Sequence, residues 1–174
     1  MGNKGNDELH GGIGNDTLEG GEHTDRLYGE GDDDSMNGGA GFDVQYGGDG
    51  NDVLFAGEGL IGDLMYGEGD NDTLTGGHGK DVIDGGNGDD SLTGGAGDDV
   101  LIGGANDDII KGQAGHDVIL GGDGKDELYA GDENEMIEPL LADFLTPYNH
   151  LLAREIEITN PSDNIDGDLD LNQA

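Results

Sequence analysis

The chain lacks several kinds of residue, and each absence excludes a class of protein. Its 174 residues include no cysteine, so a disulfide scaffold is excluded. Six lysines and arginines stand against 41 aspartates and glutamates, giving a formal net charge of −35. Nucleic acid phosphates need a basic surface, so we expect no nucleic acid partner, and anionic membranes and polyanionic sugars are disfavoured. No run of about 18 apolar residues is present, so we expect no membrane span.

Glycine is abundant instead, with 38 residues, and it recurs at a fixed spacing. An acidic, glycine-rich composition alone would be typical of a disordered chain. Here, however, units of nine residues run from Gly2 to Glu138, fifteen in all, and two extra residues at 60–61 lengthen the unit over 56–66. Residues 47–55 read Gly-Gly-Asp-Gly-Asn-Asp-Val-Leu-Phe, the best-preserved copy. A period this regular predicts a repeat architecture.

We number the positions of each unit as slots one to nine, and two slots are nearly invariant in type. Slot eight is apolar in fourteen of the fifteen units, with Gln45 as the exception. Slot six is acidic throughout. It holds Asp7, Asp16, Asp25, Asp34, Asp43, Asp52, Asp63, Asp72, Asp81, Asp90, Asp99, Asp108, Asp117 and Asp126, with Glu135 in the last unit.

The order of residues within a unit predicts a turn followed by a strand. Glycines in slots one, two and four allow positive φ angles and leave carbonyl groups free to face a common centre, and the slot-six carboxylate adds oxygens to them. Slots seven to nine predict a three-residue strand whose middle side chain points inward. Two units would make one 18-residue turn of a right-handed coil, so that loops stack on the same edge. All-oxygen ligation with six or more donors selects calcium over transition metals.

These residues resemble the repeats-in-toxin (RTX) family, whose nonapeptide is Gly-Gly-x-Gly-x-Asp-x-apolar-x. The resemblance covers residues 2–138. It implies an all-β fold, the calcium-bound right-handed parallel β-roll, with the fourteen slot-six aspartates as side-chain ligands and loop carbonyls completing each site. It also implies a secreted bacterial protein exported by type I machinery. The chain enters its first repeat directly, without a signal peptide, and we expect it to be a fragment of a longer protein.

Charge predicts that the fold depends on the metal. Eight loops stacked on one edge and seven on the other leave at most 13 gaps between successive loops. One calcium ion in every gap would add a charge of +26 and change the net charge from −35 to −9. Without metal, repulsion among the carboxylates opposes compaction. We therefore predict an unfolded metal-free chain that folds when calcium is added.

The gaps are not expected to be equivalent, because several glycine slots hold other residues. His23 and Asn106 each replace one glycine, and two loops carry a glutamate and an aspartate in two glycine slots, Glu30 with Asp32 and Glu68 with Asp70. Sites touching residues 20–34 and 56–72 are therefore the doubtful ones, and residues 76–129 hold the surest. The extra carboxylates could instead bind an ion in another geometry.

Slots seven and nine point outward, and reading every second unit separates two unlike faces. One face is mixed and mostly polar. The other is apolar from Val44 to Met136 and includes Val44, Leu64, Val82, Val100 and Val118. Contiguous apolar patches usually mark a contact surface, here for an upstream domain or the C-terminal segment. The alternative is that β-branched residues are present only because they favour strands.

The composition changes after Glu138. Residues 139–159 are predicted to begin as a helix with proline at its first position, to break or kink at Pro147, and to end in a strand over 155–159. This segment is predicted to cap the open end of the solenoid or to pack along the apolar face. Residues 160–174 are acidic and are predicted to be a disordered tail; a second interpretation is a calcium loop, although the downstream glutamate of an EF-hand is missing.

No catalytic motif is present: the five histidines are scattered, and the zinc-protease and serine-hydrolase motifs are absent. We therefore predict no enzyme activity in this chain, although an upstream enzyme or toxin domain would fit the family. The predicted function is a calcium-binding module that folds after secretion and stabilises or presents its parent protein. The alternative is a polysaccharide-binding or adhesive module, because Tyr28, Tyr46 and Tyr66 align near Arg26. Slot five carries no regular threonine or asparagine ladder, which argues against ice binding.

Overall fold

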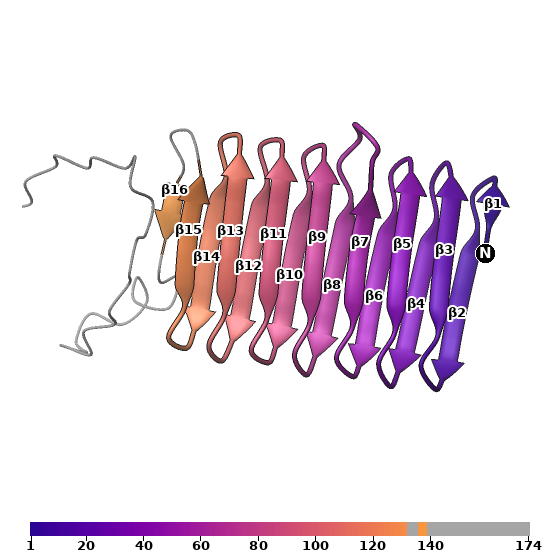
Figure 1. Cartoon of the computed structure of the whole chain (residues 1–174), viewed down its shortest axis with the longest axis horizontal. Coiled ribbons are helices and arrows are strands. Elements are labelled where there is room, and N and C mark those ends of the chain that lie inside the picture. The colour runs from indigo at the N-terminus through magenta and orange to yellow at the C-terminus, as the bar shows by residue number, and fades with distance from the viewer. Residues whose placement is uncertain (132–135, 139–174) are drawn as a thin grey trace, which may run out of the picture.

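A computed structural model describes residues 1–131 and 136–138, and this part of the chain is a two-sided β-solenoid (Figure 1). It contains strands and tight turns but no helix in the described residues. About seven turns of roughly 18 residues are stacked along one axis. The predicted all-β parallel solenoid is confirmed. The predicted cap over 139–159 and tail over 160–174 lie outside the described residues.

The strands form two parallel sheets, and consecutive strands alternate between them. Sheet A consists of β1 (Asn3–Lys4), β3 (Thr17–Glu22), β5 (Ser35–Ala40), β7 (Val53–Gly57), β9 (Thr73–His78), β11 (Ser91–Ala96), β13 (Ile109–Ala114) and β15 (Glu127–Gly131). Sheet B consists of β2 (Glu8–Ile13), β4 (Arg26–Gly31), β6 (Val44–Asp49), β8 (Leu64–Gly69), β10 (Val82–Asn87), β12 (Val100–Ala105), β14 (Val118–Asp123) and β16 (Met136–Glu138).

The register between neighbouring strands follows the repeat. Val82 pairs with Val100, eighteen residues on, so equal slots of every second unit lie side by side. Across the two extra residues at 60–61 the offset becomes twenty, as in the pair Tyr46 and Tyr66, and the register on both sides is unchanged. The insertion is therefore accommodated entirely in the loop.

Most strands are six residues long, and the predicted length of three was wrong. In β10, for example, slots seven to nine continue through slots one to three of the next unit. Gly86, in slot two, has a φ of 105°, so the backbone bends there and still pairs with Gly104. A glycine accommodates this bend inside a strand because it has no Cβ. Only slots four to six form the turn proper.

The core is a stack of slot-eight side chains between the sheets. Those from Leu27 to Leu128 are at most 2% exposed. Gln45 is the polar exception, and its Nε2 donates to the Phe55 carbonyl oxygen at 2.9 Å. Its buried Oε1 has no partner in the described part of the chain.

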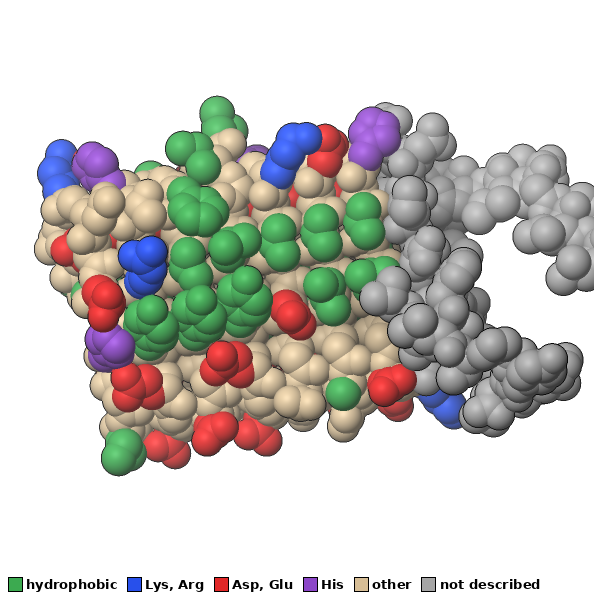
Figure 2. All heavy atoms as spheres, turned by 180° about the vertical axis from the view of Figure 1, so that it is seen from behind, with side chains coloured by type: hydrophobic (Ala, Val, Ile, Leu, Met, Phe, Trp, Pro, Cys, Tyr) green, Lys and Arg blue, Asp and Glu red, His purple; other side chains and the backbone are tan. Residues whose placement is uncertain are grey.

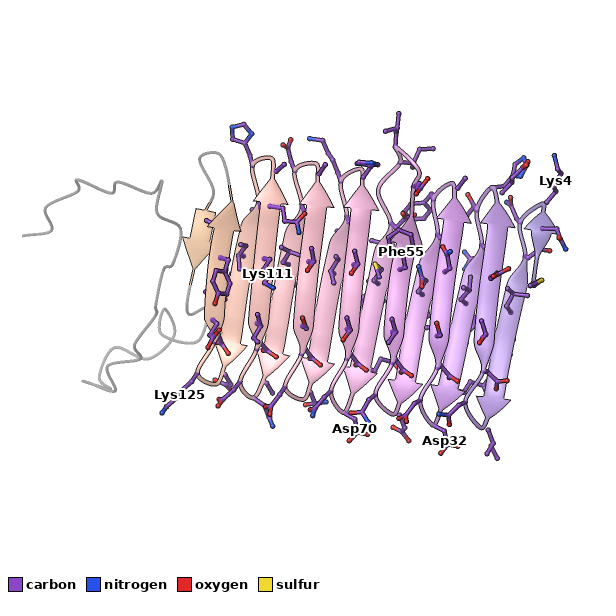
Figure 3. The ribbon with its side chains drawn as sticks, viewed as in Figure 1. Lys4, Asp32, Phe55, Asp70, Lys111 and Lys125 are labelled. Atoms are coloured by element: carbon purple, nitrogen blue, oxygen red, sulfur yellow. The ribbon has the colours of Figure 1, made fainter. Side chains whose placement is uncertain are left out.

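The outer faces of the two sheets differ as predicted. Figure 2 shows hydrophobic side chains gathered in rows along one face. In sheet B, slot seven supplies Val44, Leu64, Val82, Val100 and Val118, of which Val44 is only 8% exposed and the others are half-buried. On sheet A the outward side chains include Phe55 and Lys111, labelled in Figure 3.

Candidate metal centres

The slot-six aspartates form two straight rows, one along each edge of the solenoid, because each lies at the end of a turn just before a strand. The first edge carries Asp7, Asp25, Asp43, Asp63, Asp81, Asp99 and Asp117. The second edge carries Asp16, Asp34, Asp52, Asp72, Asp90, Asp108 and Asp126. The structure therefore brings together all fourteen predicted aspartates as neighbours within these rows. Glu135 is outside the described residues.

One carboxylate oxygen links successive turns in twelve of the fourteen aspartates, all except the first of each row, Asp7 and Asp16. The backbone N–H of Asp81 donates to Oδ1 of Asp99 at 2.9 Å, and the N–H of Asp25 donates to Oδ1 of Asp43 at 2.8 Å. The same bond recurs along both rows with lengths between 2.7 and 3.2 Å. The ladder fixes the orientation of the carboxylates that accept these bonds.

The second carboxylate oxygen, Oδ2, is buried and has no hydrogen-bond partner in most of these residues. This holds for Asp7, Asp25, Asp34, Asp43, Asp52, Asp72, Asp81, Asp90, Asp99, Asp108 and Asp117. Eleven of the fourteen aspartates are between 0% and 3% exposed. A buried carboxylate oxygen without a donor is costly, so a repeated row of them requires a cation or a proton at each position.

In twelve of the fourteen units, a carbonyl oxygen of the neighbouring turn approaches Oδ2 across a slot-one glycine. A methyl group added to Gly38 would lie 2.7 Å from Asp43 Oδ2 and 2.6 Å from the Ala56 carbonyl oxygen. On Gly94 it would lie 2.5 Å from Asp99 Oδ2 and 2.9 Å from the Gly112 carbonyl oxygen. Slot one is glycine because the space beside its Cα is lined by oxygens of two turns. We call this arrangement the oxygen cradle.

The electrostatics of the rows are those of carboxylates held out of water. Burial, reinforced by neighbouring aspartates, raises the pKa of Asp43, Asp52 and Asp99 to about 6. The same causes raise the pKa of Asp72 and Asp108 to about 7. Hydrogen bonds from the backbone of the preceding turn oppose these shifts but do not cancel them. The rows are thus poised to accept positive charge.

The donor set determines which cation fits. Within the described residues, no three acidic, histidine or cysteine side chains converge on one point, so side chains alone form no site. Each cradle therefore has to combine carboxylate oxygens with backbone carbonyl oxygens. An all-oxygen set of this kind suits a hard cation that accepts many ligands, and calcium meets that requirement better than zinc or copper.

The turns that replace glycine keep the glycine conformation. Glu30 and Glu68 have φ values of 80° and 79°, and Asp32 and Asp70 have 71° and 68°. His23 and Asn106 likewise have positive φ angles of 90° and 86°. Asp34 and Asp72, which follow the two doubly substituted turns, are buried and lack a partner at Oδ2 like the rest. The substitutions thus leave the cradles of Asp34 and Asp72 in place.

The sequence analysis missed a second ladder, formed by slot five on the second edge. The N–H of Asn51 donates to Asp33 Oδ1 at 2.9 Å, and the N–H of Asn71 donates to Asn51 Oδ1 at 3.1 Å. The bonds continue through Asp89 and Asp107 to Lys125, between 2.8 and 3.1 Å. Figure 3 shows Asp32, Asp70 and Lys125 along this edge. Reading slot five in every second unit would have found this run of aspartate and asparagine.

These features define a class of protein: a repeat solenoid that lines each edge with oxygen cradles for a divalent cation. The family model of the RTX calcium-binding nonapeptide repeat matches the chain over residues 1–36, 11–45, 28–59, 62–92, 84–119 and 102–134. The chain therefore belongs to the RTX calcium-binding repeat family, and the solenoid is its calcium-binding β-roll, a structural module. No curated protein matches the chain. The part of the chain that the structure describes contains no helix long and apolar enough to cross a membrane.

Proposed function

We propose that this module folds on calcium binding outside a bacterial cell, after type I secretion, and there stabilises or presents its parent protein. The row of buried Oδ2 atoms without partners carries the proposal. Without a cation, each buried carboxylate would have to stay charged and desolvated or take up a proton. With calcium, the same oxygens clamp one turn to the next, so ion binding and folding are one process.

The compartment follows from the calcium level that such sites need. Extracellular calcium modules typically have dissociation constants of about 10⁻⁴ to 10⁻³ M. Where calcium is scarce the chain would remain unfolded, and outside the cell it would fold. RTX repeats are typical of secreted bacterial proteins. The fifteen-unit roll has 13 gaps between stacked loops, and an ion in every gap would reduce the formal charge from −35 to −9.

A titration tests this function. Far-UV circular dichroism and the hydrodynamic radius are followed as calcium is added to chelator-treated protein, with magnesium at equal ionic strength as the control. We expect an expanded chain without strand signal that becomes compact only with calcium. A chelated sample that stays compact and melts cooperatively would contradict the proposed switch.

We also propose that an upstream domain or the C-terminal segment covers the apolar rows of sheet B. Val44, Leu64, Val82, Val100 and Val118 lie side by side in the β6–β14 register, so they form one continuous strip. Apolar strips of this kind on a soluble fold usually mark a contact surface.

The tyrosines do not favour the alternative, a polysaccharide-binding module. The Tyr28, Tyr46 and Tyr66 rings are stacked on one another with centroids 5.2 and 5.1 Å apart, and His10 stacks on Tyr28 at 4.8 Å. Tyr28 and Tyr46 are therefore stacked on both faces and Tyr66 on one, which leaves few open ring faces on this part of the sheet. A sugar that stacks on an aromatic residue needs an open ring face. A glycan array in calcium, repeated with Tyr46→Ala, would test the alternative directly.

A further inference from the structure

The loop between β7 and β8 departs from the cradle in two ways. Slot one of this unit is Ala56, whereas thirteen of the other fourteen units have glycine there; the last unit begins with Ala130, and its acidic residue, Glu135, is outside the described residues. Leu60 and Ile61 are the two extra residues and are 86% and 58% exposed. The longer loop is visible between these strands at one edge of the solenoid (Figure 1). Both changes affect the carboxylate of Asp63.

The alanine methyl group lies where the other units leave space for oxygens. Ala56 is 0% exposed, so its side chain is enclosed in the roll. In the unmodified units, an added methyl at slot one would lie 2.5 to 2.6 Å from oxygens such as Asp25 Oδ2 and the Gly38 carbonyl. Real Cβ atoms do not approach oxygens this closely. A methyl group and a complete cradle therefore cannot share this position.

Asp63 differs from its neighbours at one oxygen only. Its Oδ1 accepts the N–H of Asp43 at 2.7 Å, and its own N–H donates to Asp81 Oδ1 at 2.7 Å, so the ladder is unbroken. Yet of the eleven buried slot-six aspartates in the described chain, Asp63 alone has no enclosed, unpartnered Oδ2. Oδ1 of Asp63 therefore keeps its hydrogen bond, whereas Oδ2 is not enclosed as it is in the intact cradles.

We propose, building on the calcium-binding function above, that the gap between the Asp63 and Asp81 loops holds no calcium ion. The first-edge row is thereby divided in two. The gap before it keeps its cradle, because Asp43 Oδ2 and the Ala56 carbonyl oxygen lie in the usual places beside Gly38. On the second edge, Asp52 and Asp72 keep their bond of 2.8 Å and their free Oδ2 atoms, so that row is continuous. The roll is clamped on one edge only at this turn.

Counting ions tests the inference. Native mass spectrometry of the full chain at saturating calcium gives the number bound to the wild type. A repaired variant combines Ala56→Gly with deletion of Leu60 and Ile61, which restores a nine-residue unit. We expect it to bind one ion more than the wild type.

Two further variants serve as matched comparisons. Gly94→Ala places a methyl group in an intact first-edge cradle and should lose one ion. Gly31→Ala is the control, because the nearest atom to its added methyl is 3.9 Å away, and it should keep the wild-type count.

The outcomes separate the two proposals. A wild type that binds no calcium would overturn the proposed function. A wild type that binds calcium, together with a repaired variant that binds no additional ion, would overturn only the divided row. The test rests on the gain of an ion by the repaired variant. It therefore does not depend on whether Gly94→Ala folds.

Discussion

Most slot-six aspartates divide the carboxylate between two tasks. Oδ1 accepts a backbone N–H from the turn before, which fixes the side chain, and Oδ2 is held without a donor beside a carbonyl oxygen of the next turn. The first interaction needs no metal, whereas the second is unfavourable until a cation arrives. The residue thus sets the geometry of the cradle before the ion binds.

Asp99→Asn separates these tasks. The amide oxygen can still accept the Asp81 N–H, but one negative charge of the cradle is gone. We expect the calcium-saturated chain to lose about 1.5–3 kcal/mol in its free energy of unfolding, the range for an interaction with a charged group. Urea denaturation in saturating calcium measures it.

Asp98→Asn is the matched control, because Asp98 is exposed: it pairs at the surface with Lys80 and His116, and its Oδ1 accepts the His116 backbone N–H, which an asparagine oxygen can also accept. Surface pairs of this kind contribute little. If the two variants had equal stability, Asp99 would have no role as a ligand.

The raised pKa values predict opposite pH effects with and without calcium. In the metal-free chain, burial raises the pKa of Asp43, Asp52 and Asp99 to about 6, above the ordinary 3.8, so protonation favours the folded state. This stabilisation is complete below pH 4 and is lost as the pH rises through 6. We therefore expect chelated protein to gain strand signal as the pH falls from 8 to 5.

With calcium present the sign reverses, because protons and calcium compete for the same carboxylates. The calcium concentration at the folding midpoint should rise as the pH falls below 7. Circular dichroism titrations at pH 7.5 and 5.5 provide both measurements. A midpoint that does not change with pH would mean that buried carboxylates are not the ligands.

At the scale of the strand, the sequence predicted which side chains point inward but not where strands end. The prediction that slot eight points inward is confirmed by Leu101 and Ile110, because side chains alternate between the two faces of a strand and slots seven and nine then point outward. Glycines in slots one to three look like turn residues, and only the backbone shows that Gly104, at a φ of 117°, bends a strand that continues. The Asp33–Asn51 ladder was missed because slot five differs between the two edges.

The apolar face of sheet B makes its own prediction. Val100→Lys on β12 and Ser91→Lys on β11 change half-buried slot-seven residues on opposite sheets. If another segment covers sheet B, only Val100→Lys buries a charge, and it should cost about 1–3 kcal/mol more. Urea midpoints of the full chain in saturating calcium compare the two. Equal costs would indicate that the sheet B face is open to water.

At the scale of the whole molecule, a net charge of −35 raises the question of whether calcium acts at sites or only by neutralising charge. High salt distinguishes binding at sites from general neutralisation of charge. At 1 M ionic strength the Debye length is about 3 Å, so repulsion between surface carboxylates is largely screened. Buried Oδ2 atoms are reached only by an ion that enters the cradle.

We therefore expect 1 M sodium chloride with chelator to leave the chain expanded, and millimolar calcium in the same salt to fold it. Small-angle scattering gives the radius in each condition. Compaction by sodium chloride alone would indicate that general screening, and not the cradles, controls folding.

The eighteen-residue register also limits how the length of such a protein can change. Losing or duplicating two adjacent units, as in the step from Val82 to Val100, would bring every later strand back to its own sheet and edge. Losing a single unit would move each downstream strand to the opposite sheet. The apolar outward residues of sheet B would then lie on the mostly polar face of sheet A, and the polar residues of sheet A on the apolar face. Gene-level expansion or contraction of this roll should therefore proceed in pairs of repeats, while small loop insertions such as the one after Gly59 are absorbed without penalty to the register.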